Sequence, residues 1–242
     1  MQAGAPQEVT RTPTSEVVPG EDKAMKTKLF ELGSKAMQSL GPVNSINMHL
    51  CGLAFYVDNP ERQVELHHYC TNLNDEVTQC VVYDSDKPDA RLVGVEYVIS
   101  HRLFNNLDPE EQKLWHSHQT DVKTASFIAP ELPERIDRAL MSKLANTYGK
   151  TWVLWQTDKG DPLPLGGPQL MMVKTKTEDW NPQLFAHRDQ RLGMNSHELR
   201  ERRKEIETSP VHPHADAWEK GDFYICKLEK QSGLTRAHEA RK

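Results

Sequence analysis

Apolar side chains first recur at helical spacing in residues 22–40. Met25, Leu29 and Leu32 lie three or four positions apart, and the lysines of this segment lie mostly on other sides of the helix. The pattern predicts an amphipathic helix that ends before the Gly-Pro pair at 41–42. We expect it to pack on its own domain, with attachment to a membrane or lipid-droplet surface as the alternative.

The next four apolar segments are rich in residues typical of β-strands. They cover residues 46–57, 62–70, 76–85 and 90–100. A cluster of turn residues at 84–90 separates the last two segments, which indicates a hairpin. The pattern in this half of the chain therefore predicts largely antiparallel strands.

The second half of the chain mixes helical and strand-like patterns. Asp108 followed by Pro109 has the form of a short helix start, and Asn195 has the form of a cap on a final charged helix. We expect longer helices at 132–149 and 195–205, and strands at 124–129, 151–157, 170–175 and 222–229. Hairpins with separated helices indicate an α+β fold.

Together these elements predict a single domain of residues 22–229, built on a mainly antiparallel sheet flanked by helices. Residues 1–21 are rich in Pro, Thr, Glu and Gly and poor in large apolar side chains, so we expect a disordered tail. Residues 230–242 are expected to form a second, flexible tail for the same reason.

Composition excludes several functional classes. The chain has 242 residues and a formal net charge of −5, a mildly acidic balance that does not favour nucleic-acid binding. It contains no CxxC pair, no run of roughly 18 apolar residues, and no secretory pattern at residues 1–23. We expect a cytoplasmic protein whose four cysteines are reduced, buried thiols.

The candidate chemistry begins in residues 113–124, where one serine separates His116 from His118. If this segment is extended, both imidazoles point to one face, because side chains alternate along a strand. Two histidines on one face, joined by a carboxylate from elsewhere, form the 2-His-1-carboxylate pattern of a transition-metal site. The alternative is that both histidines are ordinary hydrogen-bonded residues.

Glu96 is the best carboxylate for such a site, as a ligand or as a catalytic general base. It lies inside an apolar strand, where an ionised carboxylate is costly unless a cation or hydrogen bonds compensate. The alternatives are that Glu96 faces solvent or pairs with Arg91 or Arg102.

Further metal-ligand candidates are His49, His67 and His68. Because His67 and His68 are adjacent in a strand, they point to opposite faces, and we expect only one of them to serve. Cysteines could supply soft ligands, which favours zinc or copper over iron. A thiolate nucleophile at Cys51 or Cys70 beside a histidine is a further alternative.

Several long motifs in a fixed order resemble the oil-body-associated proteins, a domain-of-unknown-function family first named from plant seeds. The resemblance covers roughly residues 28–207 and rests on "NSINMHLCGLAFY", "RQVELHHYC", "QCVVYDSDKPDARLVGVEYVIS", "LWHSH", "YGKTW", "WQTDKGDPLPLGGPQLMM" and "RERR". The family pattern includes His49, His67, His68, Cys70, Cys80, Glu96, His116 and His118. The plant pattern often has an acidic residue after the double histidine, where this chain has Gln119.

The resemblance implies lipid-droplet association, while relatives in fungi and bacteria imply a more general biochemical role. We carry two hypotheses. The first is a metal-binding protein, leaning to a metalloenzyme that uses iron, zinc or copper and acts on a small or lipid-like substrate. The second is a non-enzymatic structural protein of the lipid-droplet surface that attaches through the helix at 22–40.

Overall fold

Six antiparallel strands close into a small barrel in the computed structural model, which describes residues 18–230. The strands are β1 (Met48–Tyr56), β2 (Asn59–Asn72), β3 (Val77–Tyr83), β4 (Leu92–Ser100), β7 (Thr147–Val153) and β8 (Gln169–Met172). They pair in the order β2-β3-β4-β7-β8-β1, and β1 pairs again with β2. Two short strands, β5 (His116–Ser117) and β6 (Phe127–Ile128), pair with β7 and β1. The α+β fold and its antiparallel sheet are confirmed.

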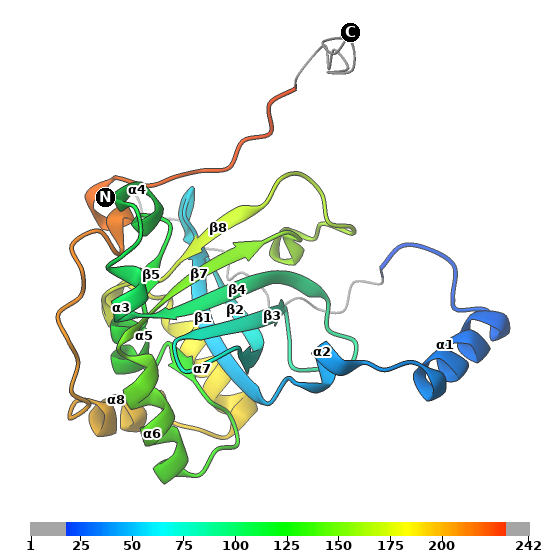
Figure 1. Cartoon of the computed structure of the whole chain (residues 1–242), viewed down its shortest axis with the longest axis horizontal. Helices are drawn as coiled ribbons and strands as arrows, with labels where there is room; N and C mark the ends of the chain where they lie inside the picture. The colour runs from blue at the N-terminus through cyan, green and yellow to red at the C-terminus, as the bar shows by residue number, and fades with distance from the viewer. Residues whose placement is uncertain (1–17, 231–242) are drawn as a thin grey trace, which may run out of the picture.

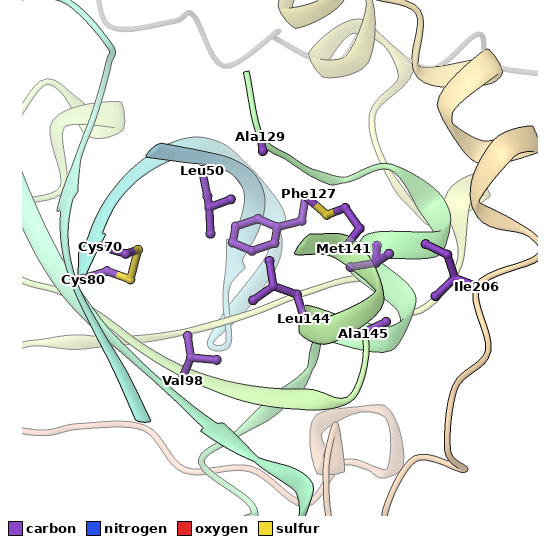
Figure 2. Close-up of a cluster of buried hydrophobic side chains, with 11 residues drawn as sticks. Leu50, Cys70, Cys80, Val98, Phe127, Ala129, Met141, Leu144, Ala145 and Ile206 are labelled. Atoms are coloured by element: carbon purple, nitrogen blue, oxygen red, sulfur yellow. A yellow bond between two sulfur atoms is a disulfide. The ribbon is translucent and has the colours of Figure 1, made fainter. Parts of the chain in front are cut away.

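The barrel interior holds two apolar clusters at different levels along the strands. The α6 cluster consists of Leu50, Cys70, Cys80, Val98, Val122, Phe127, Ala129, Met141, Leu144, Ala145 and Ile206. Figure 2 shows it between the strands and the neighbouring helices. The Tyr56 cluster consists of Ala54, Tyr56, Leu66, Val82, Val93, Val153 and Met171. Because side chains alternate along each strand, the strand residues of the two clusters lie on the same inner face, and residues from α5, α6 and the chain after α8 cover one end of it.

Helices surround the barrel on its outside and at one end (Figure 1). They are α3 (His101–Phe104), α4 (Pro109–Gln112), α5 (His118–Thr124), α6 (Glu134–Leu144), α7 (Pro182–Leu192) and α8 (Ser196–Arg203), with α2 (Gly41–Asn44) before β1. Asp108 and Asn195 cap α4 and α8 as predicted, each accepting a backbone N–H. The sequence reading missed α7, whose cap is Asn181.

The first helix, α1 (Met25–Met37), stands apart from the barrel, and Figure 1 shows it in blue beyond the sheet. The expectation that it packs on its own domain was wrong, since none of its residues is buried. Leu29 is 69% exposed and Phe30 is 64% exposed. An amphipathic stripe fixes which face is apolar, but not what covers that face.

Three further predictions about elements were wrong or only partly right. Residues 113–124 are extended only in β5, since a new helix begins at His118. The helix expected at 132–149 ends at Leu144, so that Gly149 belongs to β7 rather than to a helix end. Residues 222–229 form no strand, because no sheet edge pairs with them. The hairpin of β3 and β4 is confirmed. The two expected tails lie almost wholly in residues 1–17 and 231–242, outside the described residues.

Candidate functional site

Glu96 lies inside the barrel, at a level between the two apolar clusters. On β4 it is two residues from Val98 of the α6 cluster and three from Val93 of the Tyr56 cluster. Its exposed fraction is 2%, which excludes the solvent-facing alternative. Arg91 and Arg102 pair instead with Asp84 and Glu76. The carboxylate is therefore buried without an arginine partner among the described residues.

Three histidines converge on this carboxylate, and we call these four residues the inner group. His68 reaches it from β2, with its Nδ1 2.7 Å from Glu96 Oε2. His116 Nε2 and His118 Nε2 lie 3.4 Å and 3.6 Å from Glu96 Oε1. All three histidines are almost completely buried. The structure thus brings His116, His118 and Glu96 together as the sequence spacing suggested, and of the adjacent pair His67 and His68 it brings His68 to them.

The local chain positions the two neighbouring histidines by different means. His116 is in β5 opposite Gly149, whereas His118 begins α5 after the helix cap Ser117. The backbone N–H of Ser117 also donates to Asp216, 3.0 Å away. Burial raises the pKa of Asp216 to about 7. The two rings lie 5.1 Å apart, even though only one of the two residues is in a strand.

A threonine fixes the tautomer of His118. Thr147 Oγ1 lies 2.9 Å from His118 Nδ1 and donates its only hydrogen to the carbonyl of Leu144. The hydroxyl must therefore accept from Nδ1–H, which leaves the Nε2 of a neutral His118 with a lone pair. That lone pair faces a carboxylate oxygen, an arrangement of two acceptors that a cation between them would stabilise.

The inner group is incompletely hydrogen-bonded among the described residues. The buried atoms without a partner of hydrogen-bond geometry include His68 Nδ1, Glu96 Oε2, His116 Nδ1 and His118 Nε2. Thr151 does donate to Glu96 Oε1, at 2.9 Å. Buried polar atoms without partners are uncommon, so the shortage calls for an explanation.

The protonation states of Glu96 and His116 are those that a metal ion requires. Burial by itself raises the pKa of Glu96, but the charge of His68 and contacts with the three histidines outweigh it and hold that pKa well below its usual range. Burial lowers the pKa of His116. An ionised carboxylate beside neutral imidazole is the protonation state that binds a transition metal.

The other histidine candidates lie on the outer face of β1 and β2, in what we call the outer group: His49, Cys51, Glu65 and His67. His67 Nε2 is 2.8 Å from Glu65 Oε1, and His67 Nδ1 is 3.0 Å from His49 Nε2. Arg191 of α7 also pairs with Glu65. Cys51 is fully buried, and burial raises the pKa of its thiol. Ligand atoms of Cys51, Glu65 and His67 lie within 4.8 Å of one another, but the carboxylate and both nitrogens of His67 already have partners.

The expectation of four reduced cysteines was wrong. Cys70 and Cys80 face each other across β2 and β3 and form a disulfide, which Figure 2 shows at the edge of the α6 cluster. Only Cys51 and Cys226 are free among the described residues. Spacing could not predict the bond, because it forms between strands whose register only the fold sets.

Comparison with known proteins places the chain in a family. The model of a family described as "Protein of unknown function (DUF1264)" matches residues 40–207. The chain belongs to the DUF1264 family. DUF1264 is thus the domain that contains the barrel, α2 to α8, and both histidine groups.

Relatives in this family carry names that refer to oil bodies. The chain is 43% identical over 205 residues to "Oil body-associated protein 2A" of Zea mays, covering 83% of this chain and 81% of the relative. It is 39% identical over 212 residues to "Oil body-associated protein 1B" of Arabidopsis thaliana, covering 87% and 88%. No solved structure matches it significantly. Within residues 18–230, no helix has the length and apolar character that crossing a membrane requires.

Proposed function

We propose that this DUF1264 protein is a peripheral protein of the lipid-droplet surface, attached through α1. The observation that carries the proposal is that α1 buries none of its residues, although large apolar side chains project from it. Met25, Leu29 and Leu32 are each more than 65% exposed. In water such a stripe is unfavourable, and burial in a phospholipid monolayer would remove it from water.

The charges of α1 fit the same surface. Lys26, Lys28 and Lys35 accompany the apolar stripe, and anionic lipids attract such lysines. Because the helix is only 13 residues long, it would lie along the surface and bind it reversibly. The names of the relatives support this location, since they refer to association with oil bodies.

Flotation with phospholipid-coated triacylglycerol droplets tests the attachment. We expect Leu29→Glu with Leu32→Glu to reduce the floating fraction at least about tenfold, since burying each leucine is worth ~2 kcal/mol. The matched control is Leu73→Glu with Leu92→Glu, which adds the same charge to leucines exposed on the barrel. Equal flotation of both double variants would contradict attachment through α1.

A second candidate function is transition-metal binding at the inner group. The observation that favours it is the convergence of Glu96 Oε1, His116 Nε2 and His118 Nε2, which lie within 4.8 Å of one another and are buried. Two imidazoles and one carboxylate suit iron, zinc or copper. The missing hydrogen-bond partner of His118 Nε2 supports the same proposal, because an ion would bond to this atom.

Metal analysis of protein purified without a histidine tag tests this candidate. We expect about one ion per chain after loading with zinc, copper or iron(II), and loss of that ion from the double variant His116→Ala, His118→Ala. Wild-type protein that stays metal-free after all three loadings would contradict the proposal.

A further inference from the structure

We propose that the ion of the inner group is a buried structural ion that links β5 and α5 to β4. It occupies the space left by the missing side chain of Gly149, and we call it a clamp. In this role its remaining coordination position takes water and no larger molecule. The inference rests on the metal binding proposed above and assigns the ion a structural role instead of a catalytic one, because the residues that would bind it are buried.

Gly149 of β7 is the residue that makes space for an ion. A Cβ at this position would lie 2.5 Å from Glu96 Oε1, 2.6 Å from His116 Nε2 and 2.7 Å from His118 Nε2. These are the three candidate ligand atoms, and all are closer than a Cβ tolerates. Gly149 is not among the glycines with positive φ, so the backbone itself does not require glycine here. Glycine at this position therefore keeps the space among the three ligand atoms open.

The separations within this space match a metal polyhedron. Bonds of about 2.1 Å to nitrogen and oxygen place neighbouring ligands of a tetrahedral ion roughly 3.4 Å apart. Glu96 Oε1 lies 3.4 Å from His116 Nε2 and 3.6 Å from His118 Nε2. Both separations are long for direct hydrogen bonds, and an ion between the atoms would account for their approach.

Neighbouring residues support the candidate ligands from outside, as around known metal sites. Thr147 holds His118 in the tautomer whose Nε2 is free, and Thr151 donates to Glu96. His68 approaches the other oxygen of Glu96 at 2.7 Å. Outer contacts of this kind orient ligands and raise their affinity for metal.

The position of the inner group closes it to substrates. The exposed fractions of the four residues lie between 1% and 4%. Phe127 packs on the rings of His68 and His118 on the side of the α6 cluster. At the other end of the barrel, the Tyr56 cluster separates the group from a cavity lined in part by Tyr56, Leu66 and Val153, and no residue of the inner group lines that cavity. This cavity therefore gives a lipid-like substrate no contact with the inner group within residues 18–230.

The ion would stabilise the position of β5, which is only weakly paired with the sheet. Only two residue pairs join β5 to β7, and β7 in turn pairs with β4. An ion bonded to His116, His118 and Glu96 would connect this weakly paired segment directly to β4. Metal ligation of this kind stabilises the folded chain, because the unfolded chain has no preformed site.

The test uses the full chain without a histidine tag, loaded with cobalt(II). We expect wild-type protein to bind about one ion per chain with a tetrahedral absorption spectrum that added azide leaves unchanged. Hydrogen exchange in residues 118–124 should slow when the ion binds. Gly149→Ala removes no ligand, yet it should reduce bound cobalt at least about tenfold.

A second pair of variants tests the proposal if Gly149→Ala does not fold. Thr147→Val keeps the shape of the side chain and removes its hydroxyl, so we expect cobalt affinity to fall about 10- to 100-fold. Thr147→Ser retains the hydroxyl and should restore the affinity. Circular dichroism of each metal-free variant shows whether its fold is intact.

The outcomes separate this inference from the proposal on which it rests. Wild-type protein that binds no metal overturns both. Bound cobalt whose spectrum shifts with azide, or binding that leaves hydrogen exchange in α5 unchanged, overturns the clamp and retains metal binding. Full cobalt affinity in folded Gly149→Ala, or in Thr147→Val, overturns the proposed seat of the ion.

Discussion

The inner and outer groups lie on opposite faces of the barrel wall, and both combine glutamate with histidine. His67 and His68 are consecutive residues of β2, yet His67 joins Glu65 outside the barrel and His68 joins Glu96 inside it. Arg191 pairs with the outer carboxylate, whereas no arginine reaches the inner one among the described residues. In the outer group, Glu65 and both nitrogens of His67 have partners. In the inner group, four polar atoms have no partner of hydrogen-bond geometry among the described residues.

This difference teaches how two similar clusters acquire different chemistry. A carboxylate that has a guanidinium and a histidine as partners needs no further cation, so hydrogen bonds account for the outer group. A buried carboxylate among lone pairs is stable only with protons or a metal ion. Composition alone cannot separate the two cases, because both groups contain glutamate and histidine.

The largest expected effect is on metal affinity. Glu96→Gln removes the negative charge of the inner group and keeps the shape of the side chain. It should weaken zinc binding by more than about 100-fold, which exceeds the loss expected when a residue that only supports a ligand is removed. Glu65→Gln is the matched change in the outer group and should alter the affinity by about twofold at most. Isothermal titration with zinc measures both. Equal losses would remove the distinction between the groups.

The disulfide should have the next largest effect, on stability. Cys70 faces inward two residues from His68, and Cys80 pairs with Glu96 across β3 and β4. Cys70→Ser with Cys80→Ser opens a link between residues ten apart, so the free energy of unfolding should fall by about 2–3 kcal/mol. Urea unfolding without reductant measures the loss. An unchanged midpoint, or four alkylated thiols by mass in unfolded wild-type protein where the disulfide predicts two, would contradict the prediction.

Arg191→Ala should destabilise the outer group alone. It removes ion pairs with Glu65 and Asp86 that are only partly buried, so we expect the free energy of unfolding to fall by about 1–2 kcal/mol. Zinc affinity should not change, since the inner group lies on the other face of the strands. A loss of zinc binding in this variant, measured by titration beside its thermal unfolding, would show that the groups act together.

The smallest expected effect concerns pH. Burial, with the nearby charge of His67, lowers the pKa of His49 from 6.5 to about 4. Between these values the unfolded chain binds a proton that the folded chain does not, so stability is complete above pH 6.5 and falls towards pH 4. His49→Gln should flatten this part of the stability curve from urea unfolding at several pH values. The same slope in the variant would exclude His49 as its source.

Local patterns were sufficient for much of the fold. Alternating apolar strands and the turn at 84–90 predicted the hairpin of β3 and β4, and side-chain caps predicted the starts of α4 and α8. These features depend on neighbours in sequence. The strand expected at 222–229 failed for the opposite reason, because a strand needs an edge to pair with.

The part of the site that local sequence patterns mark was predicted. The spacing of His116 and His118 and the apolar surroundings of Glu96 indicated that these residues belong together, although the extended segment assumed for them is mostly helical. The roles of Gly149, Thr147 and Thr151 were missed. No local pattern marks them, because each acts on a residue that is distant in sequence.

The sequence by itself determined the antiparallel α+β class, the apolar face of α1, and the histidines and glutamates available for a site. It did so because strand and helix periods are properties of local chain geometry. Tertiary structure decided that α1 stays uncovered, that Cys70 meets Cys80, and that the adjacent His67 and His68 join different carboxylates. The physical reason is barrel closure: it gives each strand an inside and an outside, and only the register of β1 to β4 selects which residues meet there.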